Sequence, residues 1–522
     1  MTDVIDAYRD ELTGGPQFAR MISPGSDARS VCSDSSMNLY MAGVAGGSNT
    51  TKNIIDQSNV TLATFFSSAF LSKFDSSGIY QYSIGINSAS STNYIFSSNT
   101  DPTDNVYIAG QYGSTLSNIV SHSSSNISVN VASLTATSGS GSTAIASKFD
   151  SAGIYQYSRI VDTSNQDDTA YSVSTDSSSN MYFTGYYSGT PQIKGSSNSN
   201  VTTIIGTLPA ASGTSTSYCI KFNSSGIYQY SRVLEPGGGG FSRAYSTDTD
   251  SSDNMYFSGT YIATAAPIIK YVNSSNVSTS VATIPASLGG SNRTSFVSKF
   301  NSSGTYLYSI VVDSTGSDYG YSVTTDSSLN TYIAGSYQST PTIKYVNSSN
   351  VSTSVATLPA ATGSDSFVSK FNSTGTYIYS IVVDSGNNNG YSVTTDSSDN
   401  IFIAGSYTGT PTIKYVNTSN VSTSVATLPA ATSIAAFVSK FNSSGTYIYS
   451  IVVDSSNDDI GYSVTTDSFG NMYLAGNYRE TPTIKYVNTS NVSTSVATLP
   501  AAGSTNIYPF VIKFDPDGNY AP

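Results

Sequence analysis

The chain has 522 residues and a formal net charge of −12 at pH 7. A chain of this length is too long to fold around a single hydrophobic core, so several domains or many copies of one small unit are expected. The acidic balance argues against nucleic acid and anionic lipid as partners. With 38% apolar and 12% aromatic residues, the chain is too hydrophobic to be disordered.

Targeting and catalytic signals are sparse. The start, MTDVIDAYRDELTGG, is polar and acidic, unlike a signal peptide, and no run of apolar residues is long enough for a membrane helix. We therefore expect no membrane insertion and favour a cytoplasmic location. The single histidine, His122, lies in a Ser-rich run and is predicted to be a solvated loop residue. Cys32 and Cys219 are predicted to be buried thiols.

Two segments recur along the whole chain, each in seven copies. They are typified by YSVTTDSSDNIFIAGSY (391–407) and FVSKFNSSGTYIYSIVVD (437–454). In each, two runs rich in Val, Ile, Tyr, Phe and Thr flank a Ser-, Asn- or Gly-containing turn, which is the pattern of a β-hairpin. A repeat thus supplies four strands, here called a, b, c and d. Helical periodicity is absent outside, at best, residues 3–12.

These repeats predict an all-β, seven-bladed β-propeller with four-stranded antiparallel blades. The last copy, FVIKFDPDGNYAP, has a strand c but lacks a strand d, whereas the chain begins with an unmatched strand d. We therefore predict that Phe18–Ile22 pairs with strand c near Phe510–Phe514 and closes the ring, which removes an exposed sheet edge. Closure would bring the two termini together.

The predicted organisation is an N-terminal extension, 1–15, followed by a single propeller, 16–522. The blade boundaries are about 27–87, 93–162, 169–235, 243–313, 319–384, 389–454 and 460–520, the last completed by strand 16–24. An insert between strands b and c, for example 410–432, is predicted to form an extra hairpin. We expect these inserts and the d–a loops to elaborate one face of the disc.

The pattern Asp-Ser-Ser-x-Asn-x-Tyr-x-x-Gly together with Phe-Val-x-Lys-Phe-Asn-Ser-Ser-Gly-Thr resembles the SBBP-type β-propeller repeat family over about 16–520. The resemblance implies a propeller of a kind typical of bacterial surface and secreted proteins, without shared catalytic residues. The chain departs from the pattern by lacking Trp and a secretion signal. Similar repeats in large DNA viruses of amoebae imply a virion-associated particle component or a host-interaction protein, as the alternative to a cytoplasmic location.

A recurrent aspartate precedes the a–b turn and is followed four residues later by Asn. One carboxylate per turn is too few for a calcium loop, so these residues are predicted to cap the turns. They are Asp34, Asp101, Asp176, Asp250, Asp326, Asp396 and Asp467.

A recurrent lysine lies in the middle of strand c. The seven could bind an acidic partner, but pairing with repeated carboxylates is favoured because a lysine in a packed sheet needs compensation. They are Lys73, Lys148, Lys221, Lys299, Lys370, Lys440 and Lys513.

Two further groups are candidates for binding. Acidic residues of the d–a loops could hold Ca²⁺ or a basic partner, although solvated loop charges are favoured: Asp167, Asp168, Asp313, Asp318, Asp458 and Asp459. Aromatic residues at the start of strand a could stack sugars near the channel, although a packing layer is favoured: Phe96, Tyr171, Tyr245, Tyr321, Tyr391 and Tyr462, with Arg29 departing from the pattern.

The sequence therefore predicts a non-enzymatic structural or interaction protein, a monomeric scaffold that presents hairpins to a protein or glycan partner, with a specific site in the divergent blades 1–4. No catalytic or cofactor-binding residue is assigned, and no cofactor is expected apart from the Ca²⁺ alternative. Two other functions remain open: a carbohydrate-binding or carbohydrate-active propeller using groups near the axis, and a calcium-stabilised adhesin.

Overall fold

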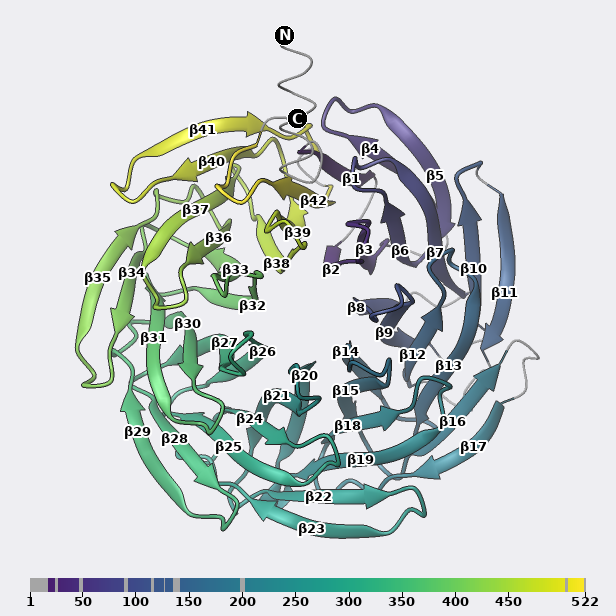
Figure 1. The fold of residues 1–522 in the computed structure, drawn as a ribbon, viewed down its shortest axis with the longest axis vertical. Coiled ribbons are helices and arrows are strands. Elements are labelled where there is room, and N and C mark those ends of the chain that lie inside the picture. Colours follow the sequence, from purple (N-terminus) through teal and green to yellow (C-terminus); the bar gives the residue numbers. More distant parts are fainter. Residues whose placement is uncertain are drawn as a thin grey trace.

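The computed structural model describes residues 17–23, 27–46, 50–88, 93–113, 117–125, 127–134, 141–197, 202–502 and 506–520. Seven antiparallel sheets are arranged around a central axis (Figure 1). The predicted all-β, seven-bladed architecture is confirmed. The predicted extension 1–15 lies outside the described residues. Among those residues, no helix is long and apolar enough to cross a membrane.

Each blade is named after the repeat that forms its four inner strands. Blade 1 contains β2 (Asp27–Ser33), β3 (Leu39–Val44), β6 (Ala69–Phe74), β7 (Tyr80–Ser88), β10 (Ser117–Ser123) and β11 (Ser128–Leu134). Blade 2 contains β8 (Tyr94–Thr100), β9 (Val106–Tyr112), β12 (Thr143–Phe149), β13 (Tyr155–Asp162), β16 (Gln192–Ser197) and β17 (Thr202–Thr207). Blade 3 contains β14 (Thr169–Thr175), β15 (Met181–Tyr187), β18 (Thr216–Phe222), β19 (Tyr228–Glu235), β22 (Ile268–Asn273) and β23 (Ser278–Thr283).

The remaining blades follow the same plan. Blade 4 contains β20 (Phe241–Thr249), β21 (Met255–Ile262), β24 (Thr294–Phe300), β25 (Tyr306–Asp313), β28 (Thr342–Asn347) and β29 (Ser352–Thr357). Blade 5 contains β26 (Tyr319–Thr325), β27 (Thr331–Gln338), β30 (Ser364–Phe371), β31 (Tyr377–Asp384), β34 (Thr412–Val416) and β35 (Ser422–Thr427). Blade 6 contains β32 (Asn389–Thr395), β33 (Ile401–Tyr407), β36 (Ala435–Phe441), β37 (Tyr447–Asp454), β40 (Thr483–Val487) and β41 (Ser493–Thr498). Blade 7 contains β38 (Ile460–Thr466), β39 (Met472–Tyr478), β42 (Tyr508–Phe514), β1 (Ala19–Ser23), β4 (Thr50–Asp56) and β5 (Thr61–Ser67), and a short 3-10 helix, η1 (Gly237–Gly239), precedes blade 4.

The prediction of four-stranded blades is wrong, because every sheet has six strands. The two outer strands are the b–c insert of the following repeat, which crosses to the preceding blade. In blade 5, for example, Val382 of strand d faces Lys414 of the donated hairpin. The inserts therefore do not elaborate one face of the disc as predicted but lie along its rim, where they satisfy the backbone groups of strand d that would otherwise form an exposed edge.

The antiparallel order places the turns on two distinct faces. The a–b turns, the c–d turns and the tips of the donated hairpins all lie on one face, which we call the turn face, because the strand direction alternates from the axis to the rim. The links between these hairpins lie on the opposite face. At the c–d turns all seven blades have a glycine with φ between 76° and 86°, a conformation that favours glycine: Gly78, Gly153, Gly226, Gly304, Gly375, Gly445 and Gly518.

The ring closes through the N-terminal strand. As predicted, β1 pairs with β42, with Ala19 opposite Ile512 and Met21 opposite Phe510. The other edge of β1 pairs with β4, so the closing blade has the same six-stranded order as the rest. The first and last described strands, β1 and β42, accordingly lie side by side (Figure 1).

Hydrogen bonds between neighbouring inner strands complete the ring around the axis. In every blade a serine hydroxyl of strand a accepts a hydrogen bond from a backbone N–H of the next strand a, over 2.9–3.3 Å. The acceptors are Ser30, Ser97, Ser172, Ser246, Ser322, Ser392 and Ser463. Beyond them, the apolar cores lie between adjacent sheets, as where Ile381 of blade 5 and Phe437 of blade 6 share one buried cluster.

Removal of residues 1–23 should lower the melting temperature sharply, because β42 and the β4–β5 hairpin both lose their partner strand. Removal of residues 1–15 is the matched control and should leave the melting curve close to that of the full chain. Differential scanning calorimetry of the two truncated chains measures this difference. An unchanged melting temperature after removal of residues 1–23 would contradict closure by β1.

Candidate functional site

Six aromatic side chains and one arginine surround the axis in a continuous chain of contacts. Ring centroids of successive members from Phe96 to Tyr462 are 5.2–5.7 Å apart. The Arg29 guanidinium carbon lies 4.2 Å from the centroid of Tyr462, and Arg29 pairs with Asp27. All the members are half-buried. The contacts between successive rings support the favoured interpretation of a packing layer.

The capping aspartates form buried polar networks. Asp326 accepts hydrogen bonds from the backbone N–H groups of Ser328 and Asn330, from the Asn330 side chain and from the Tyr332 hydroxyl, at 2.8–3.0 Å. Burial alone would raise the pKa of Asp326, but these hydrogen bonds and the Lys370 ammonium outweigh it and lower the pKa. The pKa values of Asp101 and Asp176 are lowered in the same way.

The strand c lysines are paired with these carboxylates. In six blades the Nζ–Oδ2 distance is 3.2–3.7 Å, so the prediction of paired rather than partner-binding lysines is confirmed there. Several Nζ atoms also donate to a carbonyl in the next blade, as Lys370 does to Ser443 over 2.8 Å. The Nζ of Lys513 likewise donates to Ser76 of blade 1 over 3.3 Å. Six of the seven lysines, all except Lys221, therefore link two blades through a hydrogen bond of this kind in the described structure.

The six d–a loop aspartates are not brought together. Asp318 is buried and accepts hydrogen bonds from the backbone and hydroxyl of Ser314 and from the backbone of Gln338. Asp168 and Asp459 make equivalent bonds within their own loops. Burial raises the pKa of Asp318 and of Asp168 to about 8 and that of Asp459 to about 7.

The other three aspartates also have protein partners. Asp313 pairs with Lys344 over 2.7 Å, Asp167 accepts hydrogen bonds from Ser142, and Asp458 accepts one from the Ser433 hydroxyl. Among the described residues, no three His, Cys, Asp or Glu side chains are grouped closely enough to hold a metal ion.

The prediction of a solvated His122 is wrong. His122 lies on β10, is 1% exposed, packs against Phe65 and contacts the Ser128 hydroxyl over 2.7 Å. Burial lowers its pKa. The donated hairpin carries this residue into the contact between blades, so the Ser-rich run misled the prediction. Both cysteines are buried as predicted.

Clefts at successive blade junctions were not predicted from the sequence. Each is lined by the outer strands of one blade and by the c–d turn and hairpin tip of the next. The clefts at junctions 3–4, 4–5 and 5–6 have volumes of about 480, 490 and 550 Å³, whereas that at junction 2–3 has about 900 Å³. The sequence signal for this difference is Gly195, which stands where the other full-length inserts have Tyr271, Tyr345, Tyr415 or Tyr486.

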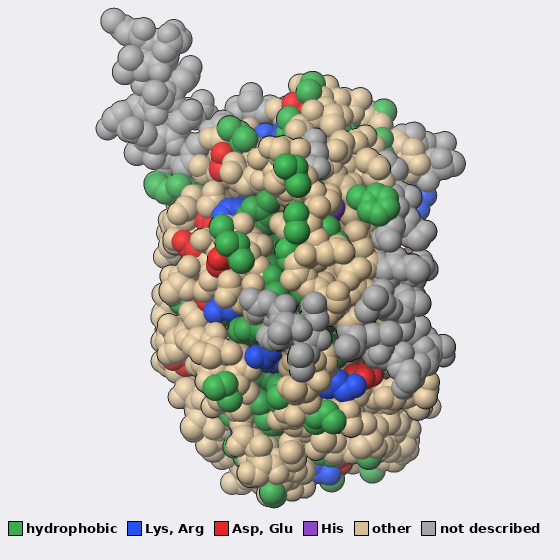
Figure 2. Space-filling view, turned by 90° about the vertical axis from the view of Figure 1, so that its right-hand side faces the viewer, with side chains coloured by type: hydrophobic (Ala, Val, Ile, Leu, Met, Phe, Trp, Pro, Cys, Tyr) green, Lys and Arg blue, Asp and Glu red, His purple; other side chains and the backbone are tan. Residues whose placement is uncertain are grey.

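The c–d turns also differ between the two halves of the disc. Blades 1–3 have Ile79, Ile154 and Ile227 at one turn position, 60–62% exposed. Blades 4–6 have Thr305, Thr376 and Thr446 there. The side of the disc that carries the outer hairpins of blades 7, 1 and 2 is mostly polar and uncharged, with hydrophobic, acidic and basic side chains distributed over it (Figure 2). The exposed residues at this turn position therefore differ between blades 1–3 and the more regular blades 4–6.

Comparisons with known proteins identify no family for this chain. No protein-family model matches the chain, and no curated protein matches it significantly. Similar solved structures include the Dos1 propeller (7% identity, TM-score 0.38, covering 95% of this chain and 94% of that one) and a eukaryotic initiation factor (9%, 0.36, 91% and 98%). Another is dipeptidyl peptidase 4 of Porphyromonas gingivalis (10%, 0.32), where the match covers 91% of this chain but 60% of the peptidase.

Substitution of Asp326 by Asn should lower the free energy of unfolding at pH 7 by about 3 kcal/mol or more, because Lys370 loses its buried counter-charge. Substitution of the half-exposed Asp399, which caps a neighbouring turn, is the matched control and should cost about 1 kcal/mol or less.

The pH dependence follows from the lowered pKa of Asp326. Its contribution is present above the unfolded pKa of about 4 and is lost as the pH falls through the lower folded pKa. Urea unfolding of both variants at pH 3 and pH 7 should therefore show the Asp326 effect shrinking at low pH. Equal effects of the two substitutions at pH 7 would contradict this role.

Proposed function

We propose that this protein is a non-enzymatic scaffold that binds a protein partner through the turn face of blades 1–3. The closed ring supports this proposal, because neighbouring blades are linked through β1, the inner serines and the lysine pairs and give a rigid surface. The acidic and basic side chains that recur in the repeats are engaged with one another. A partner would therefore recognise the positions at which the blades differ.

The exposed isoleucines carry the proposal. Ile79, Ile154 and Ile227 occupy equivalent turns of three consecutive blades, and Ile127, 62% exposed, lies at the hairpin tip on the outer edge of blade 1. Burial of these side chains against a partner would remove apolar surface from water, which favours association. The three threonines of blades 4–6 indicate that the turn itself does not need an aliphatic side chain.

A triple variant with Ile79, Ile154 and Ile227 each changed to Thr tests the proposal. Because Thr occupies the same position in blades 4–6, the fold should be retained. The matched control changes Val351, Val421 and Val492 to Thr, which removes three aliphatic side chains, 54–56% exposed, from the hairpin tips on blades 4–6.

The measurement is quantitative capture of partners from extracts of the cells in which the protein is made. A partner retained by the wild type and the control should bind the triple Ile variant at least tenfold more weakly, which corresponds to about 1.4 kcal/mol. The proposal fails if the triple Ile variant captures the same partner equally well, or if only the control loses it.

A further inference from the structure

Three arginines occupy equivalent positions on strand d of three blades. They are Arg20 of blade 7, Arg159 of blade 2 and Arg232 of blade 3. Each donates a hydrogen bond to the carbonyl of the turn glycine in the next blade, Arg20 to Gly78 over 2.7 Å and Arg159 to Gly226 over 2.6 Å, with Arg232 bonded to Gly304. All three thus share a structural role across a blade junction.

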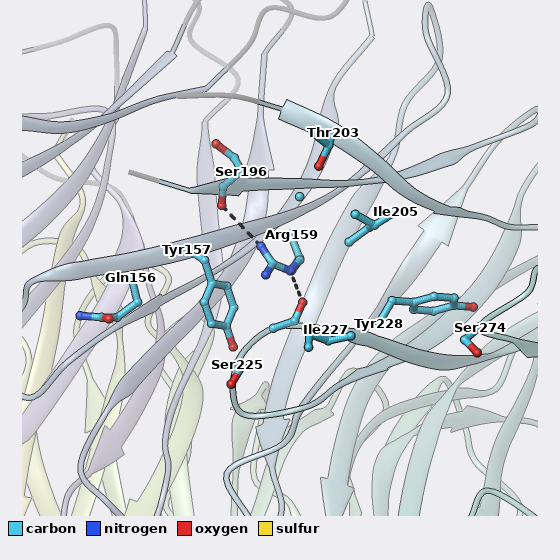
Figure 3. A pocket seen from close by; sticks show the side chains of 12 residues that line it. Gln156, Tyr157, Arg159, Ser196, Thr203, Ile205, Ser225, Ile227, Tyr228 and Ser274 are labelled. Atoms are coloured by element: carbon cyan, nitrogen blue, oxygen red, sulfur yellow. Dashed lines mark hydrogen bonds between the residues drawn. The ribbon is translucent and has the colours of Figure 1, made fainter. Parts of the chain in front are cut away.

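Arg159 and Arg232 each line a cleft, but only Arg159 of the two is partly exposed. Arg232 is 1% exposed, and its guanidinium carbon lies 4.1 Å from the centroid of Tyr271, which covers it. Tyr271 lies directly opposite Arg232 on the neighbouring strand, and Gly195 lies at the equivalent position opposite Arg159. One face of the Arg159 guanidinium contacts Tyr157 at 4.3 Å, whereas the side that a tyrosine would cover opens into the cleft (Figure 3).

The cleft is large enough for a small molecule and has a mixed lining. Its volume of about 900 Å³ falls within the range of ligand pockets, about 300–1,000 Å³. Hydroxyl groups come from Thr203, Ser225 and Ser274, and apolar surface comes from Ile205 and Ile227. Figure 3 shows Thr203 and Ile205 on one side of the Arg159 guanidinium, Ser225 and Ile227 below it, and Ser274 farther away, beyond Tyr228.

The charge of Arg159 is not compensated by any acidic side chain among the described residues, where it forms no ion pair. Its Nε and Nη1 donate to the carbonyls of Gly226, Ser158 and Ser196, which leaves Nη2 without a hydrogen-bond partner in the described structure. Burial lowers the pKa of Arg159, because the partly desolvated site disfavours the charged guanidinium. A bound anion would offset this cost through a charge-assisted hydrogen bond.

We propose that the cleft between blades 2 and 3 is a binding site for an acidic sugar residue. The carboxylate accepts a hydrogen bond from Arg159, and the ring occupies the space that Tyr271 fills in the next cleft. The sugar hydroxyls bond to Thr203, Ser225 and Ser274, while the apolar face of the ring packs against Ile205 and Ile227. The surrounding hydroxyl groups favour a sugar acid over an aromatic acid of similar size.

Calorimetric titration with a tetragalacturonate tests this proposal, with the corresponding neutral tetragalactose and with benzoate as comparison ligands. The expected result is one site per chain for the uronate and at least tenfold weaker binding of the other two ligands. Equal binding of the neutral sugar, stronger binding of benzoate, or no binding of the uronate would each overturn the proposal.

Two variants taken from the protein's own repeats separate binding from folding. Gly195→Tyr restores the tyrosine found in the other clefts, and a Cβ atom at Gly195 would meet its nearest neighbours at an ordinary 3.5 Å. Arg159→Ile introduces the residue of blades 4–6, Ile310, Ile381 and Ile451. Each should abolish uronate binding. The melting temperature of Gly195→Tyr should remain close to that of the wild type, whereas that of Arg159→Ile should fall because the hydrogen bond to Gly226 is lost. Undiminished binding in folded Gly195→Tyr would place the ligand elsewhere and refute the site.

The reverse change should create a second site. Tyr271→Gly removes the ring that covers Arg232 in the 3–4 cleft. The expected stoichiometry of uronate binding rises from one to two per chain. In the double variant Gly195→Tyr, Tyr271→Gly, one site should remain. A stoichiometry unaffected by Tyr271→Gly would contradict the inference that the exposed guanidinium creates the site.

Discussion

The structure depends on the need of each strand d to have a hydrogen-bonded neighbour on its outer side. A four-stranded blade would leave the backbone N–H and C=O groups of strand d exposed at the rim. Here the next repeat supplies a hairpin that pairs with it, as Val452 of blade 6 pairs with Lys485. Every blade is thereby joined to the next repeat by backbone hydrogen bonds as well as by side-chain packing. The outermost strand is a polar Ser- and Thr-rich segment that is mainly exposed.

The sequence predicted the parts of this fold that follow from periodicity. Seven repeats, each with two hairpins, imply the propeller, and the missing last strand implies closure by Phe18–Ile22. The destination of the insert could not be predicted, because the pattern of a hairpin is the same whichever sheet it joins. Within the insert, the only local signal is the difference in burial between two aliphatic residues: Ile413 is buried, whereas Val421 is 54% exposed. His122 was misplaced for the same reason, since its burial depends on the neighbouring blade.

The candidate site was even harder to predict from the sequence than the fold. The residues that recur most regularly, such as Asp326 and Lys370, are engaged in turns and blade contacts. The features that could bind a ligand or partner are departures from the repeat, Gly195 in place of a tyrosine and Ile227 in place of a threonine. A single glycine exposes Arg159 because strand register places the two residues opposite each other. That register could be known only once the hairpin had been assigned to the preceding blade.

Hydrogen–deuterium exchange on a chain with the hairpin 412–427 replaced by a short Gly-Ser link tests the donation of hairpins most directly. The account predicts that amide protection is lost selectively in β31 of blade 5, at Tyr377–Asp384, because the hairpin pairs with that strand. Strand β37 of the same repeat as the deleted hairpin should stay protected, since its partner is β40. Loss of protection in β37 with β31 unaffected would contradict the exchange of hairpins between neighbouring blades.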